Sequence, residues 1–573
     1  MPSSLTKTAT ISIGDTAITS FRSLRIVQSV HTYHEFELEF SDDATSPNFP
    51  FAFGDSHPLL GKKISITIEG EVSSMAKLEF DGVVAQAESA LAERELPSVL
   101  VRGYGQPYSL DVGPGTSVFA EQTAVDIITS CLGSYSGSKQ IGSATGPTHK
   151  LPYCVRYRET LWNFMRRLAY SYGAWLYYDG KKLHFTSTPG QAGSPVALQM
   201  GTTLDYLRSG TRAVAQKVVY SDYFSLDDAP GTGEAGTNPA LFATVPGNDL
   251  PGPQRALAAG DIKSFATNQS ASLAAQVGYV TGQSAVPGLS IGTTISIDTA
   301  PEGGSSLGNF TVVEVTHILT ESLVYRCQFT AVPAAVKAMP PGPLHHPVSE
   351  AQVGTVLDNK DPKNLGRVQV KLAWMSGSEK TPWLRVLAPH YGQGKQDKSR
   401  GFQFVPEKDD QVMVGFQHGD PERPFVFGAM PHGKNAAVPK PSAEAHLSVT
   451  SGSTVSFLDS ESAHELHVQV DDKNLMTIVV NSGQGTITIN ASKDILLKAT
   501  QEITLDAPTI NLKGQNVAIK GAVKVDIAGA QVGIKADAEL KAEGAIVKVA
   551  GTGMATFESS GITTVKGSMV MIN

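Results

Sequence analysis

The feature that most constrains this chain is a short apolar repeat that begins near Asn481 and runs toward the C-terminus. Pairs of branched apolar residues recur almost every eight residues, with small residues, Lys, Asp and Glu between them. A fixed short period of strand-forming residues is typical of a β-solenoid. One inward-facing pair per repeat cannot enclose a core within one chain, whereas three chains wound about a common axis each supply one wall of a triangular prism.

The repeat therefore predicts a C-terminal triple-stranded β-helix that is trimeric and intertwined. Its composition agrees, because beyond Val480 there is one aromatic residue, Phe557, one proline, Pro508, and no arginine. The residues predicted to form the trimer core are Ile487, Ile489, Ile495, Leu497, Ile503, Leu505, Ile510, Leu512, Val517 and Ile519.

The rest of the chain is predicted to be mainly β. A length of 573 residues is too great for one core, and 55 Gly and 33 Pro with few apolar stretches of helical period favour many short strands and turns. Residues 36–40 and 64–68 alternate as half-buried strands do. A net charge of −8 is not the footprint of a nucleic-acid-binding protein.

Two short helices and one hairpin interrupt the strands of residues 1–340. Residues 123–131 form the first helix, and residues 161–172 form the second, with Thr160 as N-cap and Gly173 just past its end. An Asp-Gly pair at residues 179–180 predicts a type I′ hairpin turn. Residues 229–252 are rich in Gly, Pro and Asn and are predicted to be a long loop.

A proline-rich segment around residues 339–343 marks a domain boundary. Beyond it, residues 351–435 carry five predicted strands, which is the size of an OB barrel. The sequence thus predicts five parts. They are residues 1–340 with two related barrels and small α/β insertions, the linker 341–350, the OB domain 351–435, a neck 436–480 and a needle 481–573.

Cysteine content and terminal sequence indicate where the chain is made. Cys131, Cys154 and Cys327 are an odd number of distant thiols, which cannot form a complete disulfide framework. We expect small buried hydrophobes in a reducing compartment. The N-terminus has no apolar core of signal-peptide length, so we expect synthesis in the cytoplasm and export by another route.

Several motifs resemble those of VgrG proteins, the trimeric spikes of type VI secretion systems that are related to the hub and spike of contractile phage tails. The run YRETLWNF at residues 157–164 matches one family signature. GRVQV at 366–370 and GDPERP at 419–424 resemble the family's OB domain, and residues 78–84 and 288–297 resemble its hub barrels. The signature residues are Arg158, Glu159, Gly366, Arg367, Gly419, Asp420, Pro421, Arg423 and Pro424.

The resemblance covers essentially the whole chain and implies a structural role. It implies a homotrimer that joins a six-fold inner tube of Hcp-like protein to a three-fold needle, with baseplate and sheath components around it. It also implies a PAAR-like tip protein, effectors as cargo, transient contact with the target membrane, and ejection with the particle. A type VI machine, an extracellular contractile particle and a phage-tail-like particle all remain open.

Two departures from the family bear on catalysis. The phage spike has a lysozyme domain between its OB barrel and its β-helix, where this chain has only residues 436–480, too few for an enzyme domain. Many VgrG proteins carry an effector domain beyond the needle, whereas this sequence stops at Asn573. We therefore expect no catalytic site, no cofactor and no metal. The alternatives are an envelope-degrading enzyme and a secreted trimeric adhesin.

Other motifs are interpreted as structural. GTGEAG at residues 231–236 matches GxGxxG, but it follows a Pro and runs into a Pro-containing segment, so a loop is expected instead of a dinucleotide site. GLSIG at 288–292 matches GxSxG, but the alternation after it predicts a strand where a nucleophile elbow needs a helix.

Histidines that could bind a metal and aromatics that could stack on nucleic-acid bases are also interpreted as structural. The sets His31, His34 and Glu35, and His464 and His467, are expected on strands, where positions three apart face opposite sides. His345 and His346 are expected to be solvated in a flexible linker. The OB segment has 12 basic and 9 acidic residues, too balanced for a single-strand nucleic-acid groove. Four aromatics are expected to pack the barrel and its trimer contacts: Trp374, Trp383, Phe402 and Phe404.

The C-terminal residues are apolar, where a solvated rod end should be polar. Three-fold symmetry would gather three copies of Met569, Val570, Met571 and Ile572 into one platform. One interpretation is that they close the prism core, and the other is that they form a socket for a small tip protein.

Overall fold

A computed structural model gives the fold, which divides into two compact units, Met1–Asn435 and Ala436–Asn573. No helix among the described residues is long and apolar enough to cross a membrane. The structure describes residues 7–41, 57–70, 77–90, 98–143, 145–190, 194–215, 217–236, 248–251, 259–299, 305–394, 399–434, 444–459, 464–470 and 476–572.

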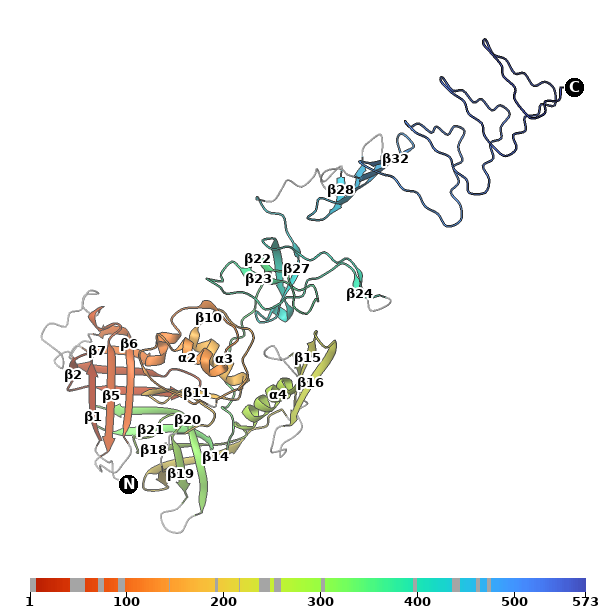
Figure 1. Ribbon diagram of the computed structural model, residues 1–573. Coiled ribbons are helices and arrows are strands. Elements are labelled where there is room, and N and C mark those ends of the chain that lie inside the picture. The colour runs from red at the N-terminus through yellow and green to blue at the C-terminus, as the bar shows by residue number, and fades with distance from the viewer. Residues whose placement is uncertain are drawn as a thin grey trace. The chain divides into compact units, whose positions relative to one another are not determined.

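A 13-stranded sheet forms the body of the first unit (Figure 1). Its path is β14-β18-β21-β20-β3-β4-β7-β6-β5-β1-β2, and β13 and β19 join beside β20. Alternating burial along β5 and β4 confirms the strand periodicity predicted for these segments. The strands are β1 Lys7–Ile13, β2 Thr16–Ile18, β3 Ser23–Ser29, β4 Glu35–Ser41, β5 Lys63–Gly70, β6 Leu78–Ala90, β7 Ser98–Gly105, β13 Val196–Gln199, β14 Leu204–Thr211, β18 Gly278–Ser284, β19 Thr294–Asp298, β20 Ser306–Thr320 and β21 Tyr325–Pro333.

A helical insertion follows β7 in the chain and has a core of its own. The predicted helices are confirmed as α2 and α3, with Thr123 and Thr160 as N-caps that accept hydrogen bonds from the third residue of each helix. The predicted type I′ turn is wrong, because only Gly180 has positive φ, while the Asp179 carboxylate accepts two backbone N–H groups. The elements are the 3-10 helix Gln106–Leu110, β8 Gly115–Phe119, α2 Ala124–Cys131, β9 Ser138–Ile141, β10 Cys154–Glu159, α3 Leu161–Ser171, β11 Trp175–Tyr178 and β12 Lys182–Thr186.

Part of the segment predicted to be a long loop is a strand. β16 Ala229–Gly236 pairs with β15 Lys217–Phe224, so the GxGxxG match lies on a hairpin strand and not in a loop. Gly233 is needed there because a side chain would meet the backbone of Ile262 on α4, Ala259–Ala274. β17 Asn248–Pro251 adds a third strand, and residues 237–247 of the expected loop lie outside the described residues.

The OB segment has a four-stranded sheet in the order β23-β22-β26-β27. The strand predicted near residues 383–387 is reduced to isolated bridges at Leu384 and Val386. A hairpin formed by β24 and β25 was not predicted. Trp374 packs against the OB core, but Phe402 and Phe404 are 46% and 54% exposed, so they do not pack this barrel. The strands are β22 Gln352–Asp358, β23 Gln369–Leu372, β24 Tyr391–Gln393, β25 Ser399–Gly401, β26 Gln411–Phe416 and β27 Pro424–Ala429.

The second unit begins as a five-stranded antiparallel sheet and continues as an extended chain. Ile487 and Ile489, which are predicted to begin the needle, lie on the last strand of this sheet. The described residues 492–572 form no strand, and their apolar side chains are exposed. The strands are β28 Glu444–Ser448, β29 Thr454–Asp459, β30 His464–Val470, β31 Met476–Asn481 and β32 Thr486–Ala491.

Candidate functional site

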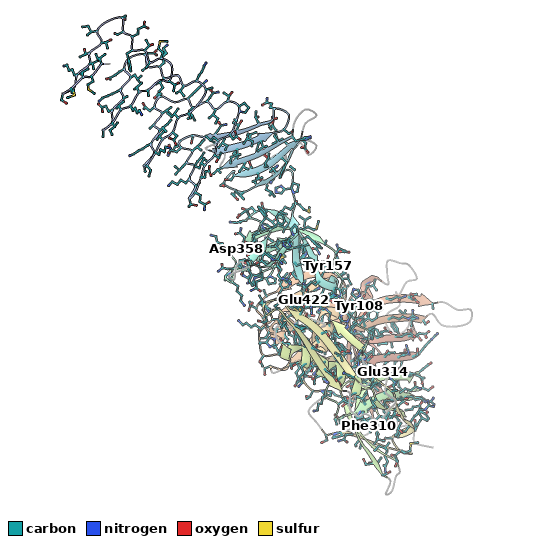
Figure 2. The ribbon with its side chains drawn as sticks, turned by 90° about the vertical axis from the view of Figure 1, so that its right-hand side faces the viewer. Tyr108, Tyr157, Phe310, Glu314, Asp358 and Glu422 are labelled. Carbon is teal, nitrogen blue, oxygen red and sulfur yellow. The ribbon has the colours of Figure 1, made fainter. Side chains whose placement is uncertain are left out.

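The two signature motifs meet in a buried ionic joint between the OB segment and the helical insertion. The GDPERP turn leaves β26 through His418 and Gly419, both with positive φ, and Asp420 then accepts the backbone N–H of Glu422 at 2.8 Å. This local geometry directs the Glu422 side chain, only 3% exposed, into the insertion. Figure 2 labels Glu422 near Tyr157, a residue of β10.

Glu422 is held by groups from β10 and α3. Its carboxylate accepts the backbone N–H of Val155 at 3.2 Å, the Cys154 thiol at 3.4 Å and Nη1 of Arg167 at 3.4 Å. Burial raises the pKa of Glu422 to about 7, and the Arg167 guanidinium opposes this rise. A carboxylate so enclosed depends on Arg167 for its charge balance.

Arg167 pairs with a second buried carboxylate, the glutamate of the YRET motif. Its Nη2 donates to Glu159 at 3.0 Å and to the carbonyl of Val155 at 2.9 Å. Burial lowers the pKa of Arg167, but the two carboxylates outweigh burial and raise it overall. Glu159 ends β10 and also accepts from Asn163 on the first turn of α3. The strand end and the helix start are therefore tied to one guanidinium.

The arginine of the GDPERP turn makes the second half of the joint. Arg423 donates through both terminal nitrogens to the Asp222 carboxylate on β15, at 2.6 and 2.9 Å, and its Nε reaches Asp420 at 3.3 Å. The Arg423 and Asp222 side chains are each 8% exposed. A two-pronged arginine–carboxylate pair fixes orientation as well as distance. The turn is thus clamped on β15 as well as on α3.

The proline-rich linker is docked and not free, contrary to the flexible linker expected from the sequence. The Asn163 side chain holds the backbone of His345 with two hydrogen bonds of 2.8 and 3.1 Å, and Ser272 donates to the Met339 carbonyl at 2.7 Å. His345 and His346 are exposed, as expected. The linker therefore adds a third attachment between the OB segment and the rest of the unit.

The remaining signature residues have separate roles. Gly366 has positive φ, and Arg367 makes a two-pronged pair with Asp361 inside the OB barrel, at 2.8 and 2.6 Å. Hydrogen bonds from Arg367 hold the pKa of Asp361 well below its usual range. Arg158 is exposed, with positive φ, and lies 3.5 Å from Glu350. The motifs identified these positions in the sequence, but their partners Asp361 and Glu350 are known only from the structure.

Three residues of the joint were missed as site residues. Glu422 lies within the GDPERP run, where its signal was a charge in a tight turn. Arg167 lies three residues beyond the YRETLWNF run, where its signal was a charge on a helix with an apolar face. Asp222 has no signal in the sequence, since it lies 201 positions from Arg423. Contacts of that span come only from the fold.

The segments considered as ligand sites lie in a turn, on a strand or just before one. His31 and His34 lie in the turn between β3 and β4 and not on a strand, while His464 and His467 lie on β30 as predicted. Among the described residues no group of three His, Cys, Asp or Glu could hold a metal. Ser290 precedes β19 with its hydroxyl 3.1 Å from that of Thr293, and a strand follows it, as predicted.

Comparisons with known proteins agree with this architecture. Residues 33–323 match the model of the phage tail baseplate hub (GPD), and residues 352–430 match the type VI secretion system/phage-baseplate injector OB domain. The type VI secretion system spike protein VgrG1a of Pseudomonas aeruginosa is 22% identical over 431 residues, which cover 69% of this chain and 64% of that protein. VgrG5 of the same organism is 31% identical over 122 residues, 19% of this chain and 15% of that protein.

A solved structure shares the fold over most of its length. The half-lidded PdpA–VgrG complex from Francisella contains a chain that matches with a TM-score of 0.58 and 9% identity, covering 84% of this chain and 87% of that one. A baseplate hub match followed by an injector OB-domain match places the chain in the class of phage-baseplate and type VI hub proteins. The chain belongs to the phage tail baseplate hub (GPD) family, whose model spans just over half of it.

The joint can be tested by removing its central cation. Arg167→Met should destabilise the first unit by about 3–5 kcal/mol, because it leaves Glu159 and Glu422 buried without a counter-charge. Urea unfolding of the full chain measures the loss, and protease cleavage near residues 339–350 should accelerate as the linker detaches.

Arg158→Met, in the YRET motif next to Glu159, is the matched control. The Arg158 and Glu350 side chains are 69% and 70% exposed, so losing that pair should cost less than about 1 kcal/mol. Equal losses for the two variants would show that the buried joint does not hold the unit together.

Proposed function

We propose that this protein is the structural trimeric spike and hub of a contractile injection machine, and not an enzyme. The observation that carries the proposal is an apolar sheet face in the second unit that continues into the apolar repeat. This face spans all five strands, and one chain leaves much of it in contact with water.

The pairing of β28 to β32 defines the two faces of the sheet. Side chains alternate sides along a strand, so residues paired across strands share a face. On one face the register aligns Leu447, Val455, Val468, Ile478 and Ile489 in one row and Phe457, Leu466, Val480 and Ile487 in another. The row between them, on the opposite face, is His446, Ser456, His467, Val479 and Thr488.

An apolar face of this size needs a cover. Phe457 is 54% exposed and Ile487 is 70% exposed, and in the apolar repeat beyond β32 Ile503 is 53% and Leu505 is 61% exposed. Monomeric proteins rarely expose such contiguous apolar surface. Three copies packed about one axis would bury it at roughly 25 cal/mol per Å² and leave the polar face outside.

The first unit fits the role of an adapter. Two barrels per chain would give a three-fold ring six similar positions, which suits a six-fold inner tube of Hcp-like protein, and closed symmetry ends the assembly. The joint at Arg167 and Glu422 would transmit thrust from the hub to the OB segment without a hinge. Sheath contraction would supply the work, so the spike needs to be stiff. Its contact with the target membrane would be transient.

The relatives support the cargo and location proposed here. One similar structure is described as a PdpA–VgrG complex, so effectors carried by the spike are part of the proposal. The particle would be assembled in the cytoplasm and ejected, with no nucleic acid bound. An envelope-degrading enzyme is the alternative, and a zymogram on peptidoglycan would reveal it.

Light scattering and electron microscopy test the proposal together. The purified chain should have a mass of about 180 kDa, three times its 60.6 kDa, and should sit at the tip of a sheathed tube in purified particles. A monomer at micromolar concentration, or a tip without this chain, would refute it.

A tip partner is predicted at the C-terminal end. Met569, Val570, Met571 and Ile572 are 50–92% exposed, and three copies would offer a small apolar platform for a PAAR-like cone. Deleting residues 570–573 should leave the trimer intact and abolish co-purification of a conical protein from the native producer. Full occupancy by that protein after the deletion would mean that these residues only close the core.

A further inference from the structure

Two parts of the large sheet repeat the same strand pattern. In the first, β6 is long and pairs with β7 through a bulge between Val84 and Gln86. In the second, β20 is long and pairs with β21 through a bulge between Val312 and Glu314. The bulges superimpose Val84 on Val312, so residue n of β6 corresponds to residue n + 228 of β20.

The neighbouring strands follow the same correspondence. β5 pairs with β6 through Ile64 and Gly82, and β19 pairs with β20 through Ile295 and Phe310. Before each of these strands lies a glycine of positive φ whose N–H bonds to the bulge residue, Gly61 to Val84 and Gly292 to Val312. The repeat therefore includes backbone detail and not only strand order.

On the other side of the bulge the correspondence reaches β3 and β14. β7 pairs with β4, which pairs with β3, and in the same way β21 pairs with β18, which pairs with β14. Arg102 on β7 and Thr330 on β21 are equivalent, because they pair with the equivalent residues Gln86 and Glu314. From Arg102 the pairing leads through Glu37 to Arg25 on β3, and from Thr330 it leads through Thr281 to Arg208 on β14, so Arg25 corresponds to Arg208. Residue n of β3 thus corresponds to residue n + 183 of β14.

Within the chain the two repeats join where β20 pairs with β3, from Glu314 and Ser29 to Thr320 and Ser23. By the correspondence, the counterpart of this joint would pair β6 with β14. Those two strands lie far apart in the order of the sheet, and β14 ends it.

Both strands have an unpaired edge among the described residues. β5 pairs with β6 only up to Val83, so the segment from Ala85 to Ala90 has no strand on that side. Arg212 donates to Val277 beside β18, so the backbone groups of Leu207, Ser209 and Thr211 point away from the sheet. Open edges of this kind are templates for pairing with another chain.

We propose that β6 of one copy pairs antiparallel with β14 of the next copy, which repeats between chains the β20–β3 joint found within one chain. The occupant of each edge is therefore a second copy of this protein, and the inference rests on the trimer proposed above. The correspondence fixes the register. It pairs Gln86 with Arg212, Ala87 with Thr211, Glu88 with Gly210, Ser89 with Ser209 and Ala90 with Arg208.

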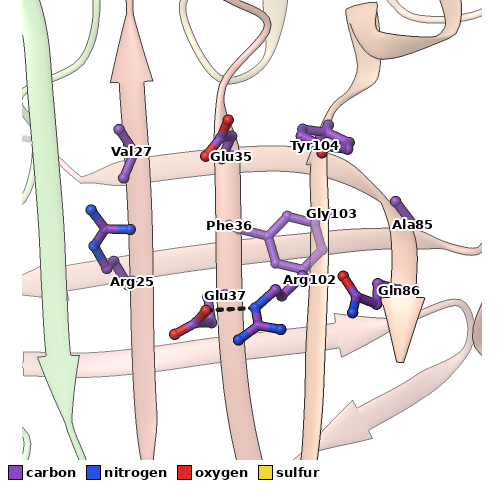
Figure 3. Close-up of a pocket in the computed structure, with 10 residues that line it drawn as sticks. All are labelled: Arg25, Val27, Glu35, Phe36, Glu37, Ala85, Gln86, Arg102, Gly103 and Tyr104. Carbon is purple, nitrogen blue, oxygen red and sulfur yellow. Dashed lines mark hydrogen bonds and ion pairs between the residues drawn. The ribbon is translucent and has the colours of Figure 1, made fainter. Parts of the chain in front are cut away.

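The side chains at these positions complement one another in charge. Arg102 already holds Glu88 at 3.3 Å within one chain, and Gln86, Arg102, Glu37 and Arg25 form a polar row across one face of the sheet (Figure 3). In the proposed seam Glu88 would face Gly210, with Arg208 and Arg212 as its diagonal neighbours. Long side chains reach such diagonal partners across a sheet.

Steric fit also favours the seam. Gly210 has no side chain because the Tyr279 ring covers it, and the Arg212 guanidinium stacks on that ring at 4.5 Å. On the opposite face Ala87, Ser89, Ser209 and Thr211 are small. Three such seams with three internal joints would make one closed sheet around the ring.

A cysteine pair tests the seam in the full chain. Ala90 and Arg208 form a pair without mutual hydrogen bonds, for which the Cα separation of about 4.5 Å permits a disulfide. The variant Ala90→Cys/Arg208→Cys should oxidise to a covalent trimer that a reducing agent reverses. The native thiols are buried, so each single variant should give none.

A shifted pair is the control. Gln86→Cys/Arg208→Cys places the thiols four residues out of register, about 14 Å apart, and should give at least about tenfold less covalent trimer. A trimer by light scattering with no cross-link in the first variant, or equal yields in both, overturns the seam and leaves the trimeric function intact. A monomer overturns both.

Discussion

Replacing Ile503 and Leu505 together by aspartate is expected to prevent the needle from forming. In the proposed prism these two positions face the axis, so three chains would bring six carboxylates into one layer. Like charges desolvated together cost several kcal/mol each, about the whole stability of a domain. Electron microscopy should then show hubs without rods.

Lys498→Asp is the control for the assigned inward face. This substitution changes the charge by two units, whereas Ile503→Asp and Leu505→Asp each change it by one. Lys498 directly follows the inward position of Leu497, so its side chain is expected in solvent. We expect less than about 0.5 kcal/mol, as for ordinary surface changes. Equal damage from the two variants would mean that the inward face is wrongly assigned.

Local periodicity carried most of the fold prediction. Strand alternation in β4 and β5 and the apolar face of α3 depend on neighbours two to four positions away, so they are visible in the sequence. β16 was misjudged because its Gly and Pro content is typical of loops, whereas here the glycines let α4 approach the strand closely. Composition cannot report that approach.

The joint was predictable in its motifs but not in its pairings. GDPERP and YRET were recognised as signatures, yet neither reveals that Glu422 enters the insertion or that Arg423 reaches Asp222. Such pairings depend on the docking of elements more than two hundred residues apart. The repeated sheet is similarly hidden, since only Leu24 and Arg25 of β3 are identical to their counterparts on β14, Leu207 and Arg208.

Acid is expected to destabilise the first unit steeply, through two buried histidines where β20 meets β3. The pKa of His34 and that of His317 are each lowered to about 3, mainly by burial. Above pH 6.5 neither histidine is protonated in either state. Below it the unfolded chain binds two protons that the folded chain refuses, so stability falls as pH drops toward 3.

The hydrogen bonds explain why the folded chain refuses these protons. Nδ1 of His317 lies 2.7 Å from the Tyr325 hydroxyl, and its Nε2 lies 3.3 Å from Oε1 of Gln28. Nε2 of Gln28 in turn lies 3.2 Å from Nδ1 of His34, so the four side chains form one hydrogen-bonded chain. A neutral ring at each position gives every link one donor and one acceptor. Protonation would place a second donor at an accepting nitrogen, and Nε2 of His34 has no partner among the described residues.

Nearby charged groups set the size of the effect. Asp179 faces His34 and favours its protonation, but that carboxylate is already paired with His184 at 2.7 Å. Glu422 opposes the histidines, because its raised pKa of about 7 favours the folded state as pH falls from 7 toward 4.5. The pKa of His31 is also lowered, to about 4, mainly by burial, so three histidines oppose one glutamate near pH 5.5. Each group contributes about 1.4 kcal/mol per pH unit, which leaves a loss of about 2.8 kcal/mol per unit.

Urea unfolding followed by tryptophan fluorescence at pH 7.5, 6.5, 5.5 and 4.5 measures this slope, since Trp175 is buried in the same core. His317→Gln keeps a side chain able to accept from Tyr325 and donate to Gln28, so it should remove about 1.4 kcal/mol per unit of the loss below pH 6.5. His149→Gln should leave the slope unchanged, because solvent surrounds that exposed ring in both states. If the His317→Gln slope matched that of the unaltered chain, the buried relay would not be what makes the first unit sensitive to acid, because a neutral glutamine has no proton to refuse.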